Sequence, residues 1–289
     1  LKGTQLRFSP SAYEPLISGY TRESGVRSLE RKIAAICRKS AVKIAKGEES
    51  AVSVKASNLK ELLGRPIYLS EKNDSSDKIG TVTGLAWTSV GGDTLSIEVN
   101  TMPGSGKLEL TGNLGDVMKE SAKAALSYVR SNSQKLGINT DFYKNTDIHI
   151  HIPEGAVPKD GPSAGITMTC AIISALSGRK VKHEVAMTGE VTLRGRVLPI
   201  GGLKEKTLAA YRYGIKKIII PYENKPDYDE LPDLVKDNIT FVFAKDMDTV
   251  ADTVLYPAIN GKKPHKPSRT QYIEHGDSPI KNIRGTALS

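Results

Sequence analysis

The stretch EGAVPKDGPSAG at residues 154–165 leads directly into a smooth apolar run at 166–176, which stops before Gly178. Proline is favoured at the first helical position and glycine just past the last one. The stretch therefore predicts a loop, a helix beginning near Pro162 and a glycine cap. Ser163 would then lie in the first turn, where free backbone N–H groups and the helix dipole favour an oxygen that becomes anionic. An ordinary helix cap is the simpler interpretation of this stretch taken alone.

A second segment, LPIGGLKEKTLAAYRYG at residues 198–214, predicts a helix that carries two lysines after a pair of glycines. On a helical wheel Lys206 lies on an apolar, partly small-sided face with Ala209 and Ala210. Burial on that face lowers the pKa of an amine from about 10.4 toward neutrality, as a general base requires. Spacing alone does not exclude Lys204, and a helix lysine is more often a solvated surface charge.

The motifs PKDGPSAG and MTGEVTLRGRVLPIGGLKEK resemble the proteolytic domain of the Lon family of ATP-dependent serine proteases, in its bacterial form. The resemblance continues through GLAWTSVGG upstream and IPYENK downstream, over residues 13–255. It implies Ser163 as the nucleophile, Lys206 as its base and Thr188 as a hydroxyl that holds the amine. Ordered motifs over such a length are far more specific than a lone GxSxG.

The remaining residues of the serine motif, Asp160, Gly161, Pro162 and Ala164, are expected to support the site. Asp160 has two interpretations. It caps the serine helix, or its carboxylate approaches Lys206, where it would raise the pKa of the amine and oppose base catalysis. We therefore expect the loop around Asp160 to move between resting and active states.

The chemistry expected of these residues is peptide-bond hydrolysis through an acyl-enzyme, with no cofactor and no metal in this part of the chain. For the full-length protein the resemblance implies ATP and Mg, a homohexameric ring and unfolded or damaged proteins as substrates. It also implies roles in protein quality control and the stress response. No GxxxxGK[ST] phosphate loop occurs in the sequence, so the chain is expected to be part of a longer protein.

The expected fold class is α+β, with a proteolytic domain of mixed sheets and packed helices at residues 78–255. Residues 1–50 read as a helical fragment, which resembles the end of the family's ATPase module, with Arg27 as a nucleotide sensor. Polar composition predicts a linker and loop at residues 51–77. Residues 256–289 lack periodicity and predict a flexible polar tail. Turn glycines between β-branched residues at 79–112 predict a meander of strands.

The net charge of +9 is confined to the two ends of the chain. Residues 1–50 hold ten basic and five acidic side chains, residues 256–289 hold six and two, and the middle is neutral. No basic patch with interleaved aromatics occurs, so nucleic acid is not an expected partner.

The two cysteines, Cys37 and Cys170, read as buried thiols of a reducing compartment. No stretch is long enough to span a membrane. We expect the bacterial cytoplasm, with the mitochondrial matrix as the alternative.

Two weaker motifs have simpler explanations. The GSG at 104–106 lacks the Lys-Ser/Thr helix start of a phosphate cradle. His149 and His151 alternate with isoleucines on a predicted strand, and no third ligand motif accompanies them, so an ordinary strand surface is expected.

Three rival functions remain to be weighed. A catalytically silent Lon-like domain for assembly or binding need not keep both Ser163 and Lys206. An ATP-independent peptidase of the same fold has no use for Arg27. A Ser-Lys enzyme of the β-lactamase type requires SxxK, and Ile166 occupies the lysine position.

Overall fold

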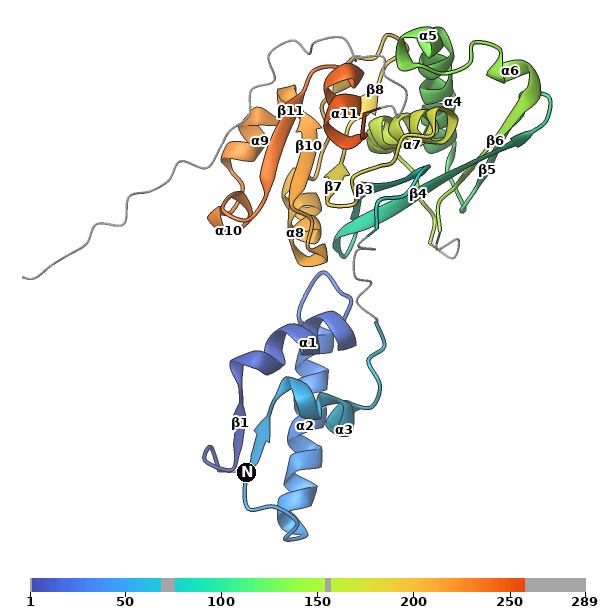
Figure 1. Cartoon of the computed structure of the whole chain (residues 1–289). Coiled ribbons are helices and arrows are strands. Elements are labelled where there is room, and N and C mark those ends of the chain that lie inside the picture. The colour runs from blue at the N-terminus through green and yellow to red at the C-terminus, as the bar shows by residue number, and fades with distance from the viewer. Residues whose placement is uncertain (1, 69–75, 154–156, 258–289) are drawn as a thin grey trace, which may run out of the picture. The chain divides into compact units, whose positions relative to one another are not determined.

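The computed structural model describes residues 2–68, 76–153 and 157–257, which form two compact units (Figure 1). The N-terminal unit holds residues 2–68 together with 87–93, and the large unit holds the other described residues. Of the tail predicted at 256–289, residues 258–289 lie outside the described residues. No helix in the described ranges is long and apolar enough to cross a membrane.

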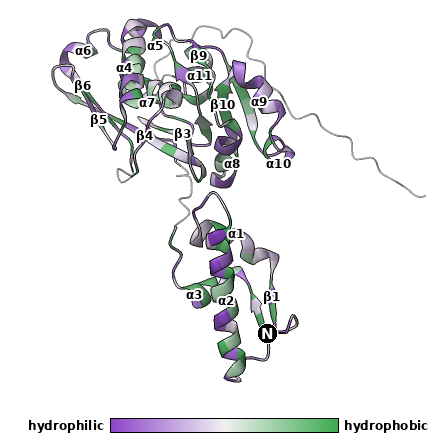
Figure 2. Ribbon diagram, turned by 180° about the vertical axis from the view of Figure 1, so that it is seen from behind, coloured by the Kyte–Doolittle hydropathy of each residue, from purple (hydrophilic) through white to green (hydrophobic). Residues whose placement is uncertain are grey.

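The N-terminal unit packs three helices beside a two-stranded parallel sheet. Its elements are β1 (Leu6–Phe8), α1 (Pro10–Tyr20), α2 (Arg27–Ala45), β2 (Val52–Val54), the 3-10 turn η1 (Ala56–Asn58) and α3 (Leu59–Leu63). Apolar residues at helical spacing place Ile33 and Ile36 of α2 in the core of this unit. Figure 2 shows hydrophilic and hydrophobic colours alternating along α2, as an amphipathic surface helix requires.

The structure differs from the sequence expectation for residues 1–77. The helices α1 and α2 lie within the fragment expected to be helical, but β1 precedes them and pairs with β2, and the first half of the expected linker is folded. Val52, Val54, Leu59 and Leu62 are all buried in the core shared with α1 and α2. Period-two alternation in VSV and three-residue spacing of leucines supply these inward faces, and the polar residues between them are the solvent side.

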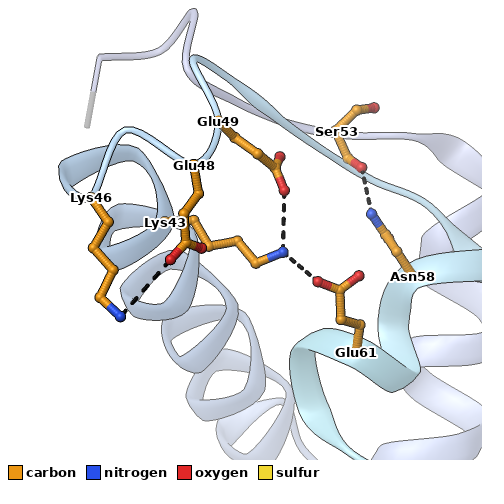
Figure 3. Close-up of polar contacts among 7 residues, drawn as sticks. All are labelled: Lys43, Lys46, Glu48, Glu49, Ser53, Asn58 and Glu61. Atoms are coloured by element: carbon orange, nitrogen blue, oxygen red, sulfur yellow. Dashed lines mark hydrogen bonds and ion pairs between the residues drawn. The ribbon is translucent and has the colours of Figure 1, made fainter.

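A lysine on α2 joins that helix to the folded segment after it (Figure 3). The Nζ of Lys43 donates to Glu49 Oε1 at 3.1 Å and also to Glu61 of α3. The hydrogen bond to Glu61 and then that to Glu49 raise the pKa of Lys43. This lysine is therefore a charged group with carboxylate partners.

The large unit is built on a seven-stranded mixed sheet in the order β11-β10-β7-β3-β4-β6-β5. Its strands are β3 (Thr81–Thr88), β4 (Gly91–Pro103), β5 (Leu108–Thr111), β6 (Thr146–His151), β7 (Val185–Met187), β10 (Lys217–Pro221) and β11 (Thr240–Ala244). The predicted meander is wrong at β5, which pairs in parallel with β6. In the motif between the serine and lysine helices, β7 joins the main sheet, and β8 (Glu190–Val191) and β9 (Val197–Leu198) pair with each other in an antiparallel hairpin.

Helices cover both faces of the sheet at its β7–β10–β11 end. The helices are α4 (Asp116–Ser131), α5 (Ser133–Leu136), α6 (Phe142–Asn145), α7 (Gly165–Ser177), α8 (Leu203–Tyr213), α9 (Lys225–Asp229), α10 (Asp233–Lys236) and α11 (Met247–Val254). Ile219 and Val242 face the core formed with α4, α7 and α11, whereas Ile218 and Phe241 face the core formed with α8 and α10. The fold class predicted from the sequence, α+β with a mixed sheet and packed helices, is confirmed.

A carboxylate ties the beginning of the large unit to its end. Asp77 Oδ1 accepts from the backbone N–H of His183 at 3.0 Å and lies 2.7 Å from His183 Nδ1, and Asp77 Oδ2 accepts from the Tyr256 hydroxyl at 2.8 Å. These hydrogen bonds, the backbone one foremost, lower the pKa of Asp77 to about 2. His183 therefore has a structural partner, in keeping with its absence from the expected chemistry.

Candidate active site

Ser163 lies at the entrance to the buried helix α7. It is the middle residue of the 3-10 turn η2 (Pro162–Ala164), and α7 follows at Gly165. Pro162 is at the first helical position, as predicted, and Gly161 before it has a φ of 128°, a conformation that favours glycine. Ser163 is half-buried, whereas Ala164 and the next ten residues are buried. The serine is thus at the outer end of a rigid helix.

The end of β7 is hydrogen-bonded to the serine turn. The N–H of Gly189 donates to the Ser163 carbonyl at 2.8 Å, and the N–H of Ile166 donates back to the Gly189 carbonyl at 3.1 Å. Thr188, next to Gly189, adds a hydroxyl hydrogen bond to the same Ser163 carbonyl at 3.3 Å. Three hydrogen bonds therefore fix the serine backbone against the carboxyl end of β7.

The two lysines of α8 have different environments. Lys204 is exposed, whereas only 3% of the surface of Lys206 is exposed to solvent. Burial lowers the pKa of Lys206 to about 8. Its Nζ donates to Thr188 Oγ1 at 3.2 Å. The structure thus selects Lys206, on the apolar face that the helical wheel indicated.

Thr188 connects the two halves of the site. Ser163 precedes α7, which packs on one face of the sheet, and Lys206 lies in α8, which packs on the other face. The Thr188 hydroxyl accepts from Lys206 Nζ and donates to the Ser163 carbonyl, at the edge where β7 ends. An amine whose pKa is lowered to about 8 is thereby linked through Thr188 to the backbone of a serine at a helix start, an arrangement suited to general-base activation of a hydroxyl.

Asp160 caps a helix, but a different one from that expected. Its Oδ1 accepts from the N–H of Met118 at 3.0 Å, in the first turn of α4, and from Gly161 N–H at 2.9 Å. The approach is so close that a Cβ on Gly115 would lie 2.3 Å from the Asp160 carboxyl carbon. Burial alone accounts for the lowered pKa of Lys206, so Asp160 does not oppose it in this conformation. Movement of the loop stays a prediction.

Two other candidates lie outside this constellation. Arg27 is exposed at the first residue of α2 in the N-terminal unit, and its nucleotide-sensing role stays a prediction. His149 Nε2 and His151 Nδ1 lie 2.8 and 2.7 Å from the same atom, Thr111 Oγ1. Within residues 2–68, 76–153 and 157–257 no group of three or more side chains is placed to hold a metal ion.

Sequence reasoning assigned no role to Asn224, which lies in the motif IPYENK. The structure buries this amide and bonds it to both backbone polar groups of Ile200, just before the lysine helix. A polar residue directly after the buried strand β10 was the available signal, but its partner is 24 positions away and is visible only in three dimensions.

The fold and these residues correspond to a known class of hydrolytic domain. Residues 53–257 match the Lon protease (S16) C-terminal proteolytic domain, and residues 1–53 match the Lon protease AAA+ ATPase lid domain. The chain therefore belongs to the Lon protease family and carries the proteolytic domain of a Lon-type serine protease.

Curated relatives agree. The chain is 58% identical over 256 residues to the Lon protease of Clostridium acetobutylicum, a match that covers 89% of this chain and 33% of that protein. It is 56% identical to Lon protease 1 of Bacillus subtilis over 255 residues, 88% of this chain and 33% of that protein. It is 55% identical to the Lon protease of Heliobacterium modesticaldum over 267 residues, 92% and 33% of the two chains. The chain thus spans about a third of the length of these relatives.

Proposed function

We propose that this chain is a serine endopeptidase unit in which Ser163 is the nucleophile and Lys206 is the general base. The observation that carries the proposal is the buried Lys206 amine, whose pKa is lowered to about 8 and which is linked through Thr188 to the backbone of Ser163. A surface lysine would be protonated at neutral pH and could not accept a proton. Burial provides the proton acceptor that the serine needs.

In the first step the neutral Lys206 amine takes the hydroxyl proton as Ser163 Oγ forms a bond to the scissile carbonyl carbon. The tetrahedral intermediate then collapses, the C–N bond breaks, and the Lys206 ammonium returns the proton to the leaving amine. Water, deprotonated by the same lysine, attacks the ester and releases the acid with Ser163 restored. Thr188 keeps the amine oriented through both proton transfers.

The oxyanion is stabilised at the start of the serine helix. The N–H of Gly161 bonds to Asp160, that of Gly165 to the Pro162 carbonyl and that of Ile166 to Gly189. We assign the oxyanion to the remaining donors of this turn, the backbone N–H groups of Ser163 and Ala164. Loss of such a donor typically lowers the rate by about 10² or more.

For the whole protein we propose ATP-dependent degradation of unfolded or damaged proteins by a hexameric ring in the bacterial cytoplasm. The match of residues 1–53 to an AAA+ lid and the bacterial relatives support this proposal. Arg27, at the start of α2, is the residue of this chain that we assign to nucleotide sensing. The sequence holds no phosphate loop, so no step of ATP hydrolysis is assigned to its residues.

The test is hydrolysis of an unstructured fluorogenic peptide without ATP by the parent chain and by Ser163→Ala and Lys206→Ala. We expect both variants to fall to background. If neither parent nor variants cut, labelling with a peptide boronate decides the question, because an intact but closed site still captures it at Ser163 and a silent domain does not. Activity that survives in Lys206→Ala would refute the dyad.

A further inference from the structure

Asn224 is a buried amide whose hydrogen bonds are complete. It is 2% exposed and lies in the 3-10 turn η3 (Tyr222–Asn224) after β10. Its Oδ1 accepts from Ile200 N–H at 3.0 Å, and its Nδ2 donates to the Ile200 carbonyl at 2.8 Å and to Asp227 Oδ2 at 2.6 Å. An amide has two N–H donors, and both are used. The Asp227 carboxylate accepts only, which fixes which end of the amide faces each Ile200 group.

Ile200 is the point from which the lysine helix starts. It follows β9 and precedes the glycine pair at 201–202, and Gly202 is the N-cap of α8 with a φ of 69°. The Gly202 carbonyl accepts from the N–H of Lys206 at 3.1 Å, so the first helical hydrogen bond reaches the lysine itself. The Ile200 side chain packs against the core shared with α8. Fixing both backbone groups of Ile200 therefore fixes where the first turn of α8 begins.

Strand β10 and the turn after it are connected by hydrogen bonds both to the partner of the Lys206 amine and to the segment from which the lysine helix starts. The Ile219 carbonyl in this strand accepts from Thr188 N–H at 3.1 Å, and Thr188 Oγ1 accepts from the lysine Nζ. Five residues after Ile219, Asn224 clamps the segment that starts the lysine helix. Strand β10 and the turn η3 that follows it thus set the position of the amine and the position of the backbone that carries it.

We propose that Asn224 is a positioning residue for the general base, which holds Lys206 in its buried place through the Ile200 clamp. The inference rests on the proposed Ser163–Lys206 chemistry. Asn224 does not touch the reacting atoms. It acts by keeping the α8 start in register with Thr188, and a misplacement of about 1 Å is enough to slow a reaction about 10²-fold.

The test is the pH dependence of peptide hydrolysis by Asn224→Ala. Without the clamp the first turn of α8 shifts and Lys206 becomes more hydrated, so the pKa of its amine rises toward that of a solvated lysine. We expect kcat at pH 8 to fall about 10- to 100-fold with KM changed less than about threefold. The alkaline-rising limb should move to higher pH, so that the deficit shrinks between pH 8 and pH 9.5.

Two further variants separate positioning from folding. Asn238→Ala removes a comparable amide, whose Nδ2 donates to the Leu234 carbonyl at 2.8 Å on the exposed surface, and should keep the parent profile. Asp227→Ala alters an exposed residue but leaves the Asn224 amide free to turn, so it should shift the profile in the same direction by a smaller amount. If Asn224→Ala does not fold, Asp227→Ala alone decides the question.

The outcomes also separate this inference from the proposed function. A parent-like pH profile in Asp227→Ala and in folded Asn224→Ala, with rate losses that follow the folded fraction, overturns the positioning role and leaves the dyad standing. Activity retained by Lys206→Ala overturns the dyad, and the positioning role with it. A shifted profile in the two clamp variants, with Lys206→Ala inactive, supports both.

Discussion

Two lysines in two regions of this molecule have opposite environments. Lys43 in the N-terminal unit is partly exposed and contacts Glu49 and Glu61, and these hydrogen bonds raise its pKa. Lys206 in the large unit is almost fully buried and has a threonine hydroxyl as its partner, and burial lowers its pKa to about 8. The first lysine stays charged and joins two segments. The second is available as a base because burial removes water without supplying a carboxylate.

The lysine that suits catalysis should therefore be the one that weakens the fold. Replacing Lys206 with methionine, which is similar in length and apolar, should stabilise the large unit at neutral pH and abolish peptide hydrolysis. The folded-state pKa lies below the unfolded value of about 10.4, so below pH 8 folding must bury a charge at a cost on the order of 2–3 kcal/mol. The free energy of unfolding, measured by urea denaturation, should rise by roughly that amount at pH 6.5.

The pH dependence of stability, and a matching substitution of Lys43, test whether the buried charge of Lys206 is the cause. The stability of the parent should rise from pH 8 to about 10.4 as the unfolded state binds the extra proton, so the advantage of Lys206→Met should shrink over that range. Lys43→Met should change stability far less than Lys206→Met, because a surface ion pair contributes little. A Lys206→Met protein less stable than the parent at pH 6.5 would show that the lysine stem, and not its charge, dominates.

Asp160 is a carboxylate close to the serine turn. Its variants test whether it contacts Lys206 and raises the pKa of that amine, as Glu49 and Glu61 do for Lys43. Asp160→Ala removes the cap of α4 and should destabilise the large unit by about 1 kcal/mol. Peptide hydrolysis should fall about tenfold, since the loop that precedes Ser163 loses its hydrogen bond to α4. Asp160→Asn retains the acceptor oxygen, so most of both losses should be recovered. The measurements are thermal unfolding and pH–rate profiles of the two variants.

The profiles also decide whether the loop moves. If Asp160 stays hydrogen-bonded to α4 throughout turnover, the part of the pH–rate profile that reflects deprotonation of Lys206 should lie at the same pH in both variants as in the parent. A shift of that limb to lower pH in both variants shows that the carboxylate comes close to the Lys206 amine at some point of the catalytic cycle, so that the loop around Asp160 moves between resting and active states.

The sequence predicted the serine helix and the lysine helix because each has a strong local signal, whereas the mixed α+β fold was implied by the resemblance to the Lon proteolytic domain. Pro162 and Gly178 lie at the two ends of the serine helix where expected, and the helical wheel placed Lys206 on an apolar face of α8, although spacing alone left Lys204 open. These features follow from hydrophobic periodicity and turn residues within a short window. They needed no knowledge of which segments meet.

The sequence did not predict features that depend on pairing between distant segments. The partner of Asp160 is a helix 42 residues earlier, and the partner of Asn224 is a loop 24 residues earlier. The pairing of β5 with β6, and of β1 with β2, likewise depends on which strands meet in space. Local patterns state that a group needs a partner, but only the fold says which partner it receives.

Two threonines of α7 differ in whether their buried hydroxyls are hydrogen-bonded, and replacing them should have a small effect that is confined to stability. Thr167 and Thr169 are both fully buried, but Thr169 Oγ1 donates to the Gly165 carbonyl at 2.8 Å, whereas the Thr167 hydroxyl has no hydrogen-bond partner among the described residues. Valine has nearly the same shape as threonine. Thr167→Val should therefore stabilise the large unit by about 1 kcal/mol, or about 2–4 °C in Tm, because an unpaired buried hydroxyl is removed.

Thr169→Val is the matched control on the same helix and should be neutral or destabilising, since it removes a hydrogen bond that is made. The N-terminal unit offers the same comparison, because the buried hydroxyl of Ser40 in α2 also has no hydrogen-bond partner in the described part of the chain, and Ser40→Ala should not destabilise that unit. Equal effects of the two threonine changes on Tm would mean that the Thr167 hydroxyl is hydrogen-bonded to a buried water.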